Sequence, residues 1–362
     1  MDSRPCIIVE FGSAWVRVGF AGEEAPRRTV SSPCRLVGGR RGGGEVTREA
    51  WFKVVAPLFA DLLTTALFVR EKRRVVLVDA PTAPRHLRSA VVDAVLNQFG
   101  SAIVFAPCVT PAHAVGFRDA AVLLDVGHHE TRCVAVRDGR VLMHSLCVTA
   151  RGGASVATAL GEILGDHRLT NLELEDAAAR ACSVRRRGAG SSEAADGLLD
   201  ETGGLVLDGD WSCGTPLKIP HAARFQAAEA LFDRIDDGPA TLADLVMGCL
   251  SKCAVDVRRA LAVRIVPCGG GAMITGFNAR LLGDLRDAGA PWDLKIPKVA
   301  FARSELGWVG ASLLATAQPS DLLPGASAED LAQDGVPDIF SVATRPADLP
   351  VLHTGARPAP HK

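Results

Sequence analysis

Short apolar runs alternate with amphipathic stretches over most of this chain. Runs such as RRVVLVDAP (73–81) and AIVFAP (102–107) have the length and the branched residues of buried strands. The stretch at 47–68 has a helical pattern, with a bend expected at Pro57. Further helices are predicted over residues 85–99, 154–165, 172–183, 222–236, 241–261 and 276–288. Strands that alternate with helices indicate a layered α/β fold.

One pattern occurs twice, in IIVEFGSAWVRV (7–18) and in VLLDVGHHETRC (122–133). Each copy has an apolar run, a carboxylate, one spacer and a glycine, and an arginine seven positions after the carboxylate. The apolar runs suit buried strands, and the residues after each glycine suit the return strand of a hairpin. Two ordinary hairpins with polar turns would explain either copy alone. Two copies in register, each opening a domain-sized half, favour a shared function.

The residues of this repeat suit an anion and a metal ion. A glycine two positions after the acid permits a tight turn with exposed backbone N–H groups, and such groups form a concave anion site. The nearby carboxylate can hold a hydrated Mg²⁺. A third segment, RIVPCGGGAMITGF (264–277), predicts a strand, a glycine-rich turn and the start of a helix, where backbone can lie against a flat ligand or an anion.

Composition narrows the class of protein. At 362 residues the chain is too long for one core, so two domains are expected. A net charge of −1 argues against a nucleic-acid binder, and no apolar run reaches the ~18 residues of a membrane span. Without a visible secretory signal we expect a cytoplasmic protein, with its ten cysteines reduced. A zinc site at Cys249 and Cys253 would need two further ligands, which the sequence does not supply.

Four segments resemble the actins and actin-related proteins. VEFGSAWVRVGFAGEEAPR resembles their first phosphate loop, including the signature GFAG-x-x-APR, and AAVLLDVGHHETRCVAV resembles the second. VPCGGGAMITGFNARL is similar to the adenosine motif, and WVGASLLATA to the tryptophan segment where the chain returns to the first domain. The resemblance implies an actin-like α/β fold, with duplicated RNase H-like domains around a nucleotide cleft. It implies a first domain of 1–115 with 308–350, a second of 116–307, and a disordered tail at 351–362.

The same resemblance implies a site for ATP or ADP with Mg²⁺. Glu10 and Asp125 would hold the metal through water, and Arg17 stands where actins have a lysine that contacts phosphate. The residues implied to contact the phosphates are Gly12, Ser13, Ala14, Arg17, Asp125, Gly127 and Gly153, and those implied to contact the adenosine are Gly269, Gly270 and Met273.

Several positions depart from the family pattern. Actins orient the attacking water with a glutamine and a histidine, and these positions fall at Cys108 and Arg132. A thiol aligns water poorly, and an arginine stays protonated and cannot act as a base. An aspartate beside the phosphates becomes His128, which we expect at the surface together with His129. A lysine–glutamate pair that grips the nucleotide falls at Ala178 and Ala179. We therefore expect a nucleotide-binding protein with weak or absent hydrolysis and no catalytic residues.

The segment 23–50 holds about half the residues that actins place there, and would be a reduced subdomain 2 with GGRRGGG as its tip. Two further segments resemble the branch of actin-related proteins at the pointed end of dynactin. They are KRRVVLVDAPTAPRHLR and LSKCAVDVRRAL. That branch implies a cap that forms no filament of its own. Its partners would be the dynactin filament and pointed-end subunits, in dynein-driven transport along microtubules. Neutral shortening, an active ATPase of the superfamily and a nuclear chromatin-remodelling subunit are the alternatives. The role of 183–215 is open.

Overall fold

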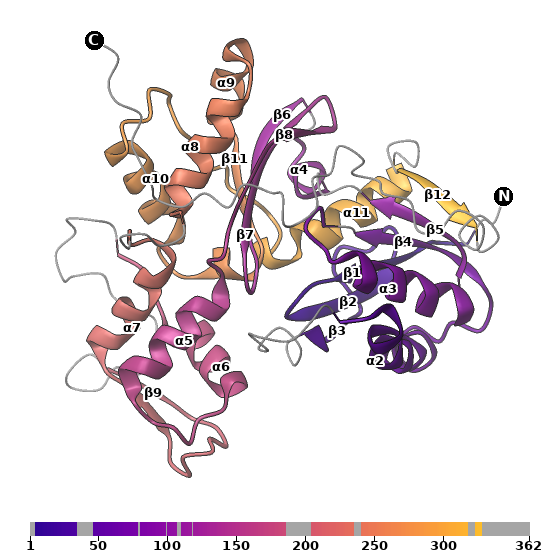
Figure 1. Cartoon of the computed structure of the whole chain (residues 1–362), viewed down its shortest axis with the longest axis horizontal. Helices are drawn as coiled ribbons and strands as arrows, with labels where there is room; N and C mark the ends of the chain where they lie inside the picture. The colour runs from indigo at the N-terminus through magenta and orange to yellow at the C-terminus, as the bar shows by residue number, and fades with distance from the viewer. Residues whose placement is uncertain are drawn as a thin grey trace. The chain divides into compact units, whose positions relative to one another are not determined.

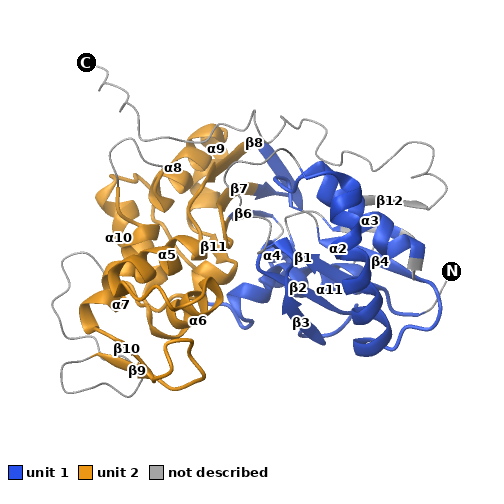
Figure 2. Cartoon of the chain, turned by 60° about the horizontal axis from the view of Figure 1, so that its bottom comes forward, with its two compact units in different colours: residues 1–123, 136–143, 298–349 blue, residues 124–135, 144–297, 350–362 orange. Residues whose placement is uncertain are grey.

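The computed structural model describes residues 4–34, 46–78, 80–98, 100–106, 110–117, 119–185, 204–234, 240–317 and 323–327 (Figure 1). The chain divides into two compact units (Figure 2). Unit 1 is made of residues 1–123, 136–143 and 298–349, and unit 2 of residues 124–135, 144–297 and 350–362. We expected boundaries after 115 and 307, whereas the units divide after 123 and 297, and residues 136–143 also fall in unit 1. The expected disordered tail, 351–362, lies outside the described residues.

Unit 1 is built on a sheet in which the described residues form six strands, in the order β12-β5-β4-β1-β2-β3. The strands are β1 (Ile7–Phe11), β2 (Trp15–Phe20), β3 (Arg28–Ser31), β4 (Arg73–Val78), β5 (Gly100–Ala106) and β12 (Leu323–Ser327). β1, β4 and β5 run parallel, whereas β2, β3 and β12 are antiparallel to their neighbours. The strand β12, with the sequence LPGAS, was not predicted because it has no alternating apolar pattern.

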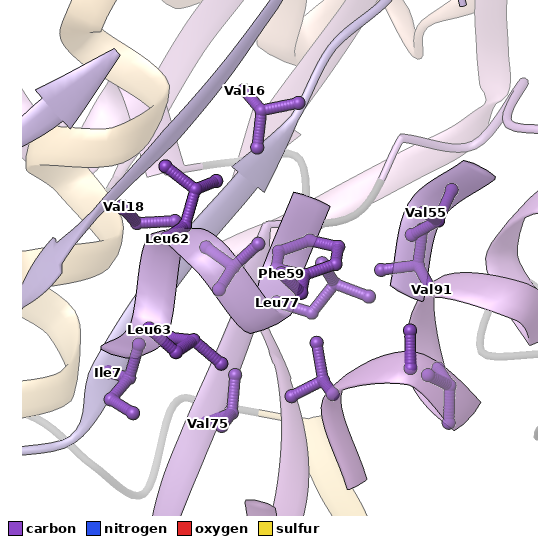
Figure 3. Close-up of a cluster of buried hydrophobic side chains, with 14 of the residues drawn as sticks. Ile7, Val16, Val18, Val55, Phe59, Leu62, Leu63, Val75, Leu77 and Val91 are labelled. Atoms are coloured by element: carbon purple, nitrogen blue, oxygen red, sulfur yellow. The ribbon is translucent and has the colours of Figure 1, made fainter. Parts of the chain in front are cut away.

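Helices cover both faces of this sheet, and its central strands therefore have sequences of consecutive apolar residues. Ile7 and Val9 of β1 belong to one core cluster with Phe59 of α2 (Arg48–Asp61) and Val91 of α3 (Arg85–Gln98), and Figure 3 shows part of this cluster. Ile8 points to the opposite face, where a second cluster holds Trp308 of α11 (Leu306–Ala317). The alternation of a β-strand therefore gives each layer of helices its own set of β1 side chains.

The helix predicted at 47–68 changes from an α-helix to a π-helix near its C-terminal end. Thr47 caps α2 by accepting a hydrogen bond from the N–H of Ala50, and Pro57 lies inside the α-helix. From Leu62 to Ala66 the chain forms a π-helix, η1. The short helix α4 (Thr110–Ala114) precedes the strands of the second half and packs against α11.

Four strands form a second sheet in the order β11-β6-β7-β8. They are β6 (Ala120–Val126), β7 (Thr131–Arg137), β8 (Arg140–Thr149) and β11 (Ile265–Cys268). The short strands β9 (Leu205–Leu207) and β10 (Leu217–Ile219) pair with each other. The helices of unit 2 are α5 (Gly153–Leu164), α6 (Asn171–Ala181), α7 (His221–Ala228), α8 (Leu242–Lys252), α9 (Val255–Ala262) and α10 (Phe277–Asp287). Most of the glycine-rich segment between α6 and β9 lies outside the described residues.

The prediction of one helix over 241–261 was wrong, because the chain breaks between α8 and α9. Cys253 and Ala254 are extended, with ψ angles of 157° and 145°. The Arg258 guanidinium stabilises the break by donating from Nε to the Cys253 carbonyl at 2.9 Å and from Nη2 to the Ser251 carbonyl at 2.8 Å. The apolar periodicity continues across both helices and carries no signal of this break.

The described cysteines are all free, and no group of His, Cys, Asp or Glu among the described residues could hold a metal ion. Cys249 and Cys253 are buried in unit 2, and their thiol pKa values are raised, mainly by hydrogen bonds among the thiols. No helix in the part of the chain that the structure describes has both the length and the apolar character needed to cross a membrane.

Candidate functional site

The two repeated segments fold into hairpins with the same turn. In β1–β2 the N–H of Gly12 donates to the Trp15 carbonyl at 2.9 Å, and in β6–β7 the N–H of Gly127 donates to the Glu130 carbonyl at 3.0 Å. A Cβ atom at Gly12 would lie 3.0 Å from the Trp15 carbonyl oxygen, and one at Gly127 would lie 2.9 Å from that of Glu130. These are close approaches of backbone, so both glycines are required by the turn itself.

Each hairpin also pairs its carboxylate with its arginine across the strands. Glu10 lies directly opposite Arg17 in the ladder, and Arg17 Nη1 is 3.0 Å from Glu10 Oε2. Arg132 Nη2 likewise forms an ion pair with Asp125 Oδ2. The spacing of seven residues was visible in the sequence, but the ion pairs depend on the register of the strands.

These pairs are partly removed from solvent, the first more than the second. The side chains of Arg17 and Glu10 are 11% and 21% exposed, and those of Arg132 and Asp125 are 18% and 34% exposed. Arg17 Nε is buried and has no hydrogen-bond partner within the described residues, so Glu10 satisfies only part of this guanidinium. An ion pair with this degree of burial is screened less by salt than a surface pair.

A glycine covers the second oxygen of each carboxylate. A Cβ atom at Gly307, in α11, would lie 2.9 Å from Glu10 Oε1. A Cβ atom at Gly269, which follows β11, would lie 2.7 Å from Asp125 Oδ1. In both hairpins, therefore, one carboxylate oxygen meets a guanidinium and the other meets glycine backbone.

The sequence led us to expect a Mg²⁺ ion, held through water, at Glu10 and Asp125. Mg²⁺ requires near-octahedral oxygen donors and keeps several waters, which in turn need carboxylate oxygens to accept their hydrogen bonds. In each hairpin an arginine holds one oxygen of the carboxylate, so a hydrated Mg²⁺ ion would share that carboxylate with a guanidinium, and the metal site stays a prediction.

The two turns differ in the backbone N–H groups that they offer to a phosphate. Ser13 and Ala14 follow Gly12, and their N–H groups take no part in the turn's hydrogen bonds in the described residues. Beside the second turn, Gly153 and Ala154 start the helix α5. Their N–H groups donate to the carbonyls of Gly127 and His128, at 2.9 and 2.8 Å, so these bonds fix α5 to the turn and occupy the N–H group of Gly153 that we expected to contact phosphate.

The three adjacent glycines after β11 have different surroundings. Gly269 has a φ of +85°, and a Cβ atom there would lie 2.4 Å from the Val126 carbonyl oxygen; at Gly271 it would lie 2.4 Å from the Val126 side chain. At Gly270 a Cβ atom would meet nothing within 4 Å. Met273, four residues after Gly269, is 52% exposed. Gly269 and Gly271 thus face the second hairpin, whereas Gly270 and Met273 leave an open surface.

The prediction that His128 lies at the surface was wrong. Its side chain is 9% exposed, and its Nε2 lies 3.2 Å from Oε1 of Glu175 in α6, whereas His129 is exposed. A partner on a separate helix buries this histidine, so no pattern around residue 128 could have revealed it. Cys108 lies outside the described residues.

Two motifs nearly 300 residues apart meet on unit 1. The ring of Trp308 in α11 fills the space above Gly19, where a Cβ atom would lie 2.6 Å from Trp308 Cζ2. Gly22, at a φ of +92°, donates its N–H to Ser312 Oγ at 2.9 Å, and Ser312 Oγ donates to the Glu23 carbonyl at 2.8 Å. The segment GFAG therefore needs its glycines for contact with α11, a role that the sequence did not reveal.

Comparison with protein families agrees with this architecture. The family model described as Actin matches residues 44–177 and 214–320, which is more than half of the chain. The matched ranges include the second hairpin, the glycine-rich turn after β11 and all of α11. With its mixed α/β sheets the chain has an actin-like fold. The chain belongs to the actin family.

Proposed function

We propose that this protein is a non-polymerising actin-related subunit that caps the pointed end of the actin-related filament in dynactin, most like actin-related protein 10 (also numbered 11). It would act in the cytoplasm, on the cytoskeleton, in dynein-driven transport along microtubules. The observation that carries the proposal is the short connection after the first hairpin. β3 ends at Ser31 and α2 begins at Arg48, whereas actins place a subdomain with a long loop in this connection.

The consequence of this short connection follows from how the subunits of an actin-type filament assemble. Its contacts are head-to-tail, so each subunit offers one face to each neighbour. The loop absent here is the part that a subunit inserts into the next one at the pointed end. A subunit that keeps its other face can add to the filament end and then offers no loop for further growth. Such a subunit caps the filament and forms no homopolymer.

The first prediction concerns which filament end stops growing. Added to short, polarity-marked filaments of its actin-related partner, the protein is expected to stop growth at the pointed end and leave barbed-end growth unchanged. The same concentration of polymerising partner subunits serves as the control and should extend the filaments. Alone at high concentration, the protein should stay in the supernatant after centrifugation. Blockage of the barbed end, or binding along filament sides, would contradict the proposal.

We further propose that the subunit binds ATP or ADP and turns it over very slowly. Support comes from Arg132, which stands at the family's histidine position and is held by Asp125 within the second hairpin. His128 is likewise engaged by Glu175. Arg132 cannot act as a base, because a guanidinium stays protonated.

The second prediction is a rate of phosphate release close to that of ATP alone. Purified protein incubated with ATP should release no more phosphate than a blank over several hours, in a continuous phosphate assay. A filament-forming actin serves as the positive control. Phosphate release as fast as that of the polymerising control would contradict the proposal of slow ATP turnover. It would not bear on the capping proposal, which has its own test.

A further inference from the structure

We propose that unit 2 binds a phosphate group at the N-terminus of α7, where Arg185, Arg224 and the first N–H groups of the helix supply the positive charge. The site goes beyond the nucleotide binding proposed above, because it uses neither the repeated hairpins nor the glycine-rich turn after β11. Arg185 follows α6, at the start of the segment whose role the sequence left open.

The N-terminus of α7 has no cap of its own. The first N–H groups of a helix have no partner within the helix, and an N-cap side chain usually accepts a hydrogen bond from one of them. The N-cap residue of α7 is Pro220, which makes no such bond, and the first turn contains no acidic residue. Ala222, in this turn, is exposed. The positive end of the helix dipole is therefore open to an anion.

A buried arginine lies in the same turn. Arg224 is 3% exposed, and its Nε donates to the Ala181 carbonyl at 2.9 Å. Its Nη1 is buried and has no hydrogen-bond partner in the part of the chain that the structure describes. Helix side chains lean toward the N-terminus, so Arg224 extends toward the uncapped end of α7. Buried polar groups normally have a partner, and an unpartnered guanidinium nitrogen therefore points to a missing acceptor.

Arg185 brings a second positive charge to this place. Its Cζ lies 3.7 Å from the centroid of the Phe225 ring, and its Nη2 lies 2.6 Å from His221 Nε2. A guanidinium can only donate, so His221 accepts at Nε2 and is neutral in this contact. Burial lowers the pKa of Arg224, and the charge of Arg185 lowers it further. Two like charges thus lie near each other, and an anion would remove their repulsion.

Another buried arginine of unit 2 shows what is missing here. Arg280 is 2% exposed, but three carboxylates pair with it. They belong to Glu229, Asp233 and Asp284. Among the described residues, Arg185 and Arg224 form no ion pair with a carboxylate. A phosphate group suits the two arginines best, because it carries nearly two negative charges at pH 7 and a guanidinium binds its oxygens in pairs.

The third prediction is that inorganic phosphate binds this site, as measured by isothermal titration calorimetry at constant ionic strength. Wild-type protein should bind phosphate saturably, and Arg185→Met should weaken binding by about tenfold or more, because a charge-assisted contact is lost. Arg180→Met is the matched control, because Arg180 also lies over an aromatic ring but pairs with Asp176. Absence of saturable binding, or equal affinities of the two variants, would overturn the proposal.

A titration with O-phosphoserine identifies the source of the phosphate. Similar affinities for phosphoserine and inorganic phosphate would support a site for an esterified phosphate group. Binding of inorganic phosphate alone would support a site for the free ion.

A variant that adds a carboxylate tests the site without removing a buried side chain. Ala222→Glu places an acid at the N-terminus of α7, so without phosphate the variant should unfold at a higher temperature than the wild type. Phosphate should raise the unfolding temperature of the wild type and leave that of the variant unchanged. Gln226→Glu is the control, because Gln226 is exposed on the same helix beyond its first turn, and it should respond as the wild type does. An equal response of both variants to phosphate would contradict the proposal.

Discussion

Replacing Gly269 by alanine is expected to destabilise unit 2 by about 3 kcal/mol and to remove nucleotide binding. Gly269 has a φ of +85° and a ψ of 166°, a conformation essentially confined to glycine that costs an L-residue ~1–3 kcal/mol. The new Cβ atom would also lie 2.4 Å from the Val126 carbonyl oxygen, and such overpacking adds ~1–3 kcal/mol. Because the obstruction is backbone, no side chain can turn aside to relieve it. Urea unfolding followed by circular dichroism measures the loss.

The neighbouring glycine provides the control for this prediction. A Cβ atom at Gly270 would meet nothing within 4 Å, so Gly270→Ala should unfold at the same urea concentration as the wild type. If Gly270 contacts adenosine, that variant should still weaken ATP binding while it leaves the fold intact. Equal stability of the Gly269→Ala and Gly270→Ala proteins would show that the backbone does not crowd Gly269 more than Gly270, and would contradict the prediction.

Local patterns were sufficient to predict the hairpins of both halves. An apolar run followed by an acid and a glycine sets a buried strand and a tight turn within a dozen residues, and neither depends on distant partners. The strands β1, β2, β6 and β7 therefore lie where the repeat placed them. The pairing of Glu10 with Arg17 was implicit in the same spacing, since residues placed symmetrically about a hairpin turn become cross-strand neighbours.

Features that depend on distant partners could not be read from the sequence. His128 is buried because Glu175 on α6 meets it, and the break before α9 is held by the bonds of Arg258 to preceding carbonyls. The strand β12 forms against β5, more than 200 residues earlier, in a sequence that contains proline and glycine. In each case a tertiary contact overrides a weak or misleading local preference.

The role of each glycine in the site also depends on neighbours that the sequence does not reveal. A glycine in a sequence indicates only that a Cβ atom is absent, and several reasons can require this. Gly12 serves a hydrogen-bonded turn, Gly19 makes room for an indole ring, and Gly307 lies against a carboxylate. Each reason involves a different neighbour, and the neighbours of Gly19 and Gly307 come from the opposite end of the chain. The nucleotide contacts assigned to Gly12 and Gly153 remain predictions.

The largest loss of stability in unit 1 is expected from Gly310→Ala, at about 3 kcal/mol or more. Helices α11 and α4 approach so closely that a Cβ atom at Gly310 would lie 1.7 Å from the Thr110 carbonyl oxygen. Since both sides of this contact belong to helix backbone, relief requires one helix to move, and overpacking of this kind costs ~1–3 kcal/mol, occasionally more. In an exposed helix the same change would stabilise the protein by roughly 0.8–1 kcal/mol. A loss of stability, rather than a gain, would therefore indicate the close approach of the two helices.

Displacement of α11 is also expected to affect the first hairpin. The same helix contributes Gly307 beside Glu10, Trp308 above Gly19 and Ser312 in its bond with the N–H of Gly22. Gly310→Ala should therefore weaken ATP binding even at temperatures where the protein stays folded. Leu313→Ala is the control, because Leu313 lies on the same helix and is 41% exposed, and its unfolding midpoint and ATP affinity should match the wild type. A Gly310→Ala protein as stable as this control would show that α11 and α4 are not in backbone contact, and the seating of Glu10 against α11 would then need another explanation.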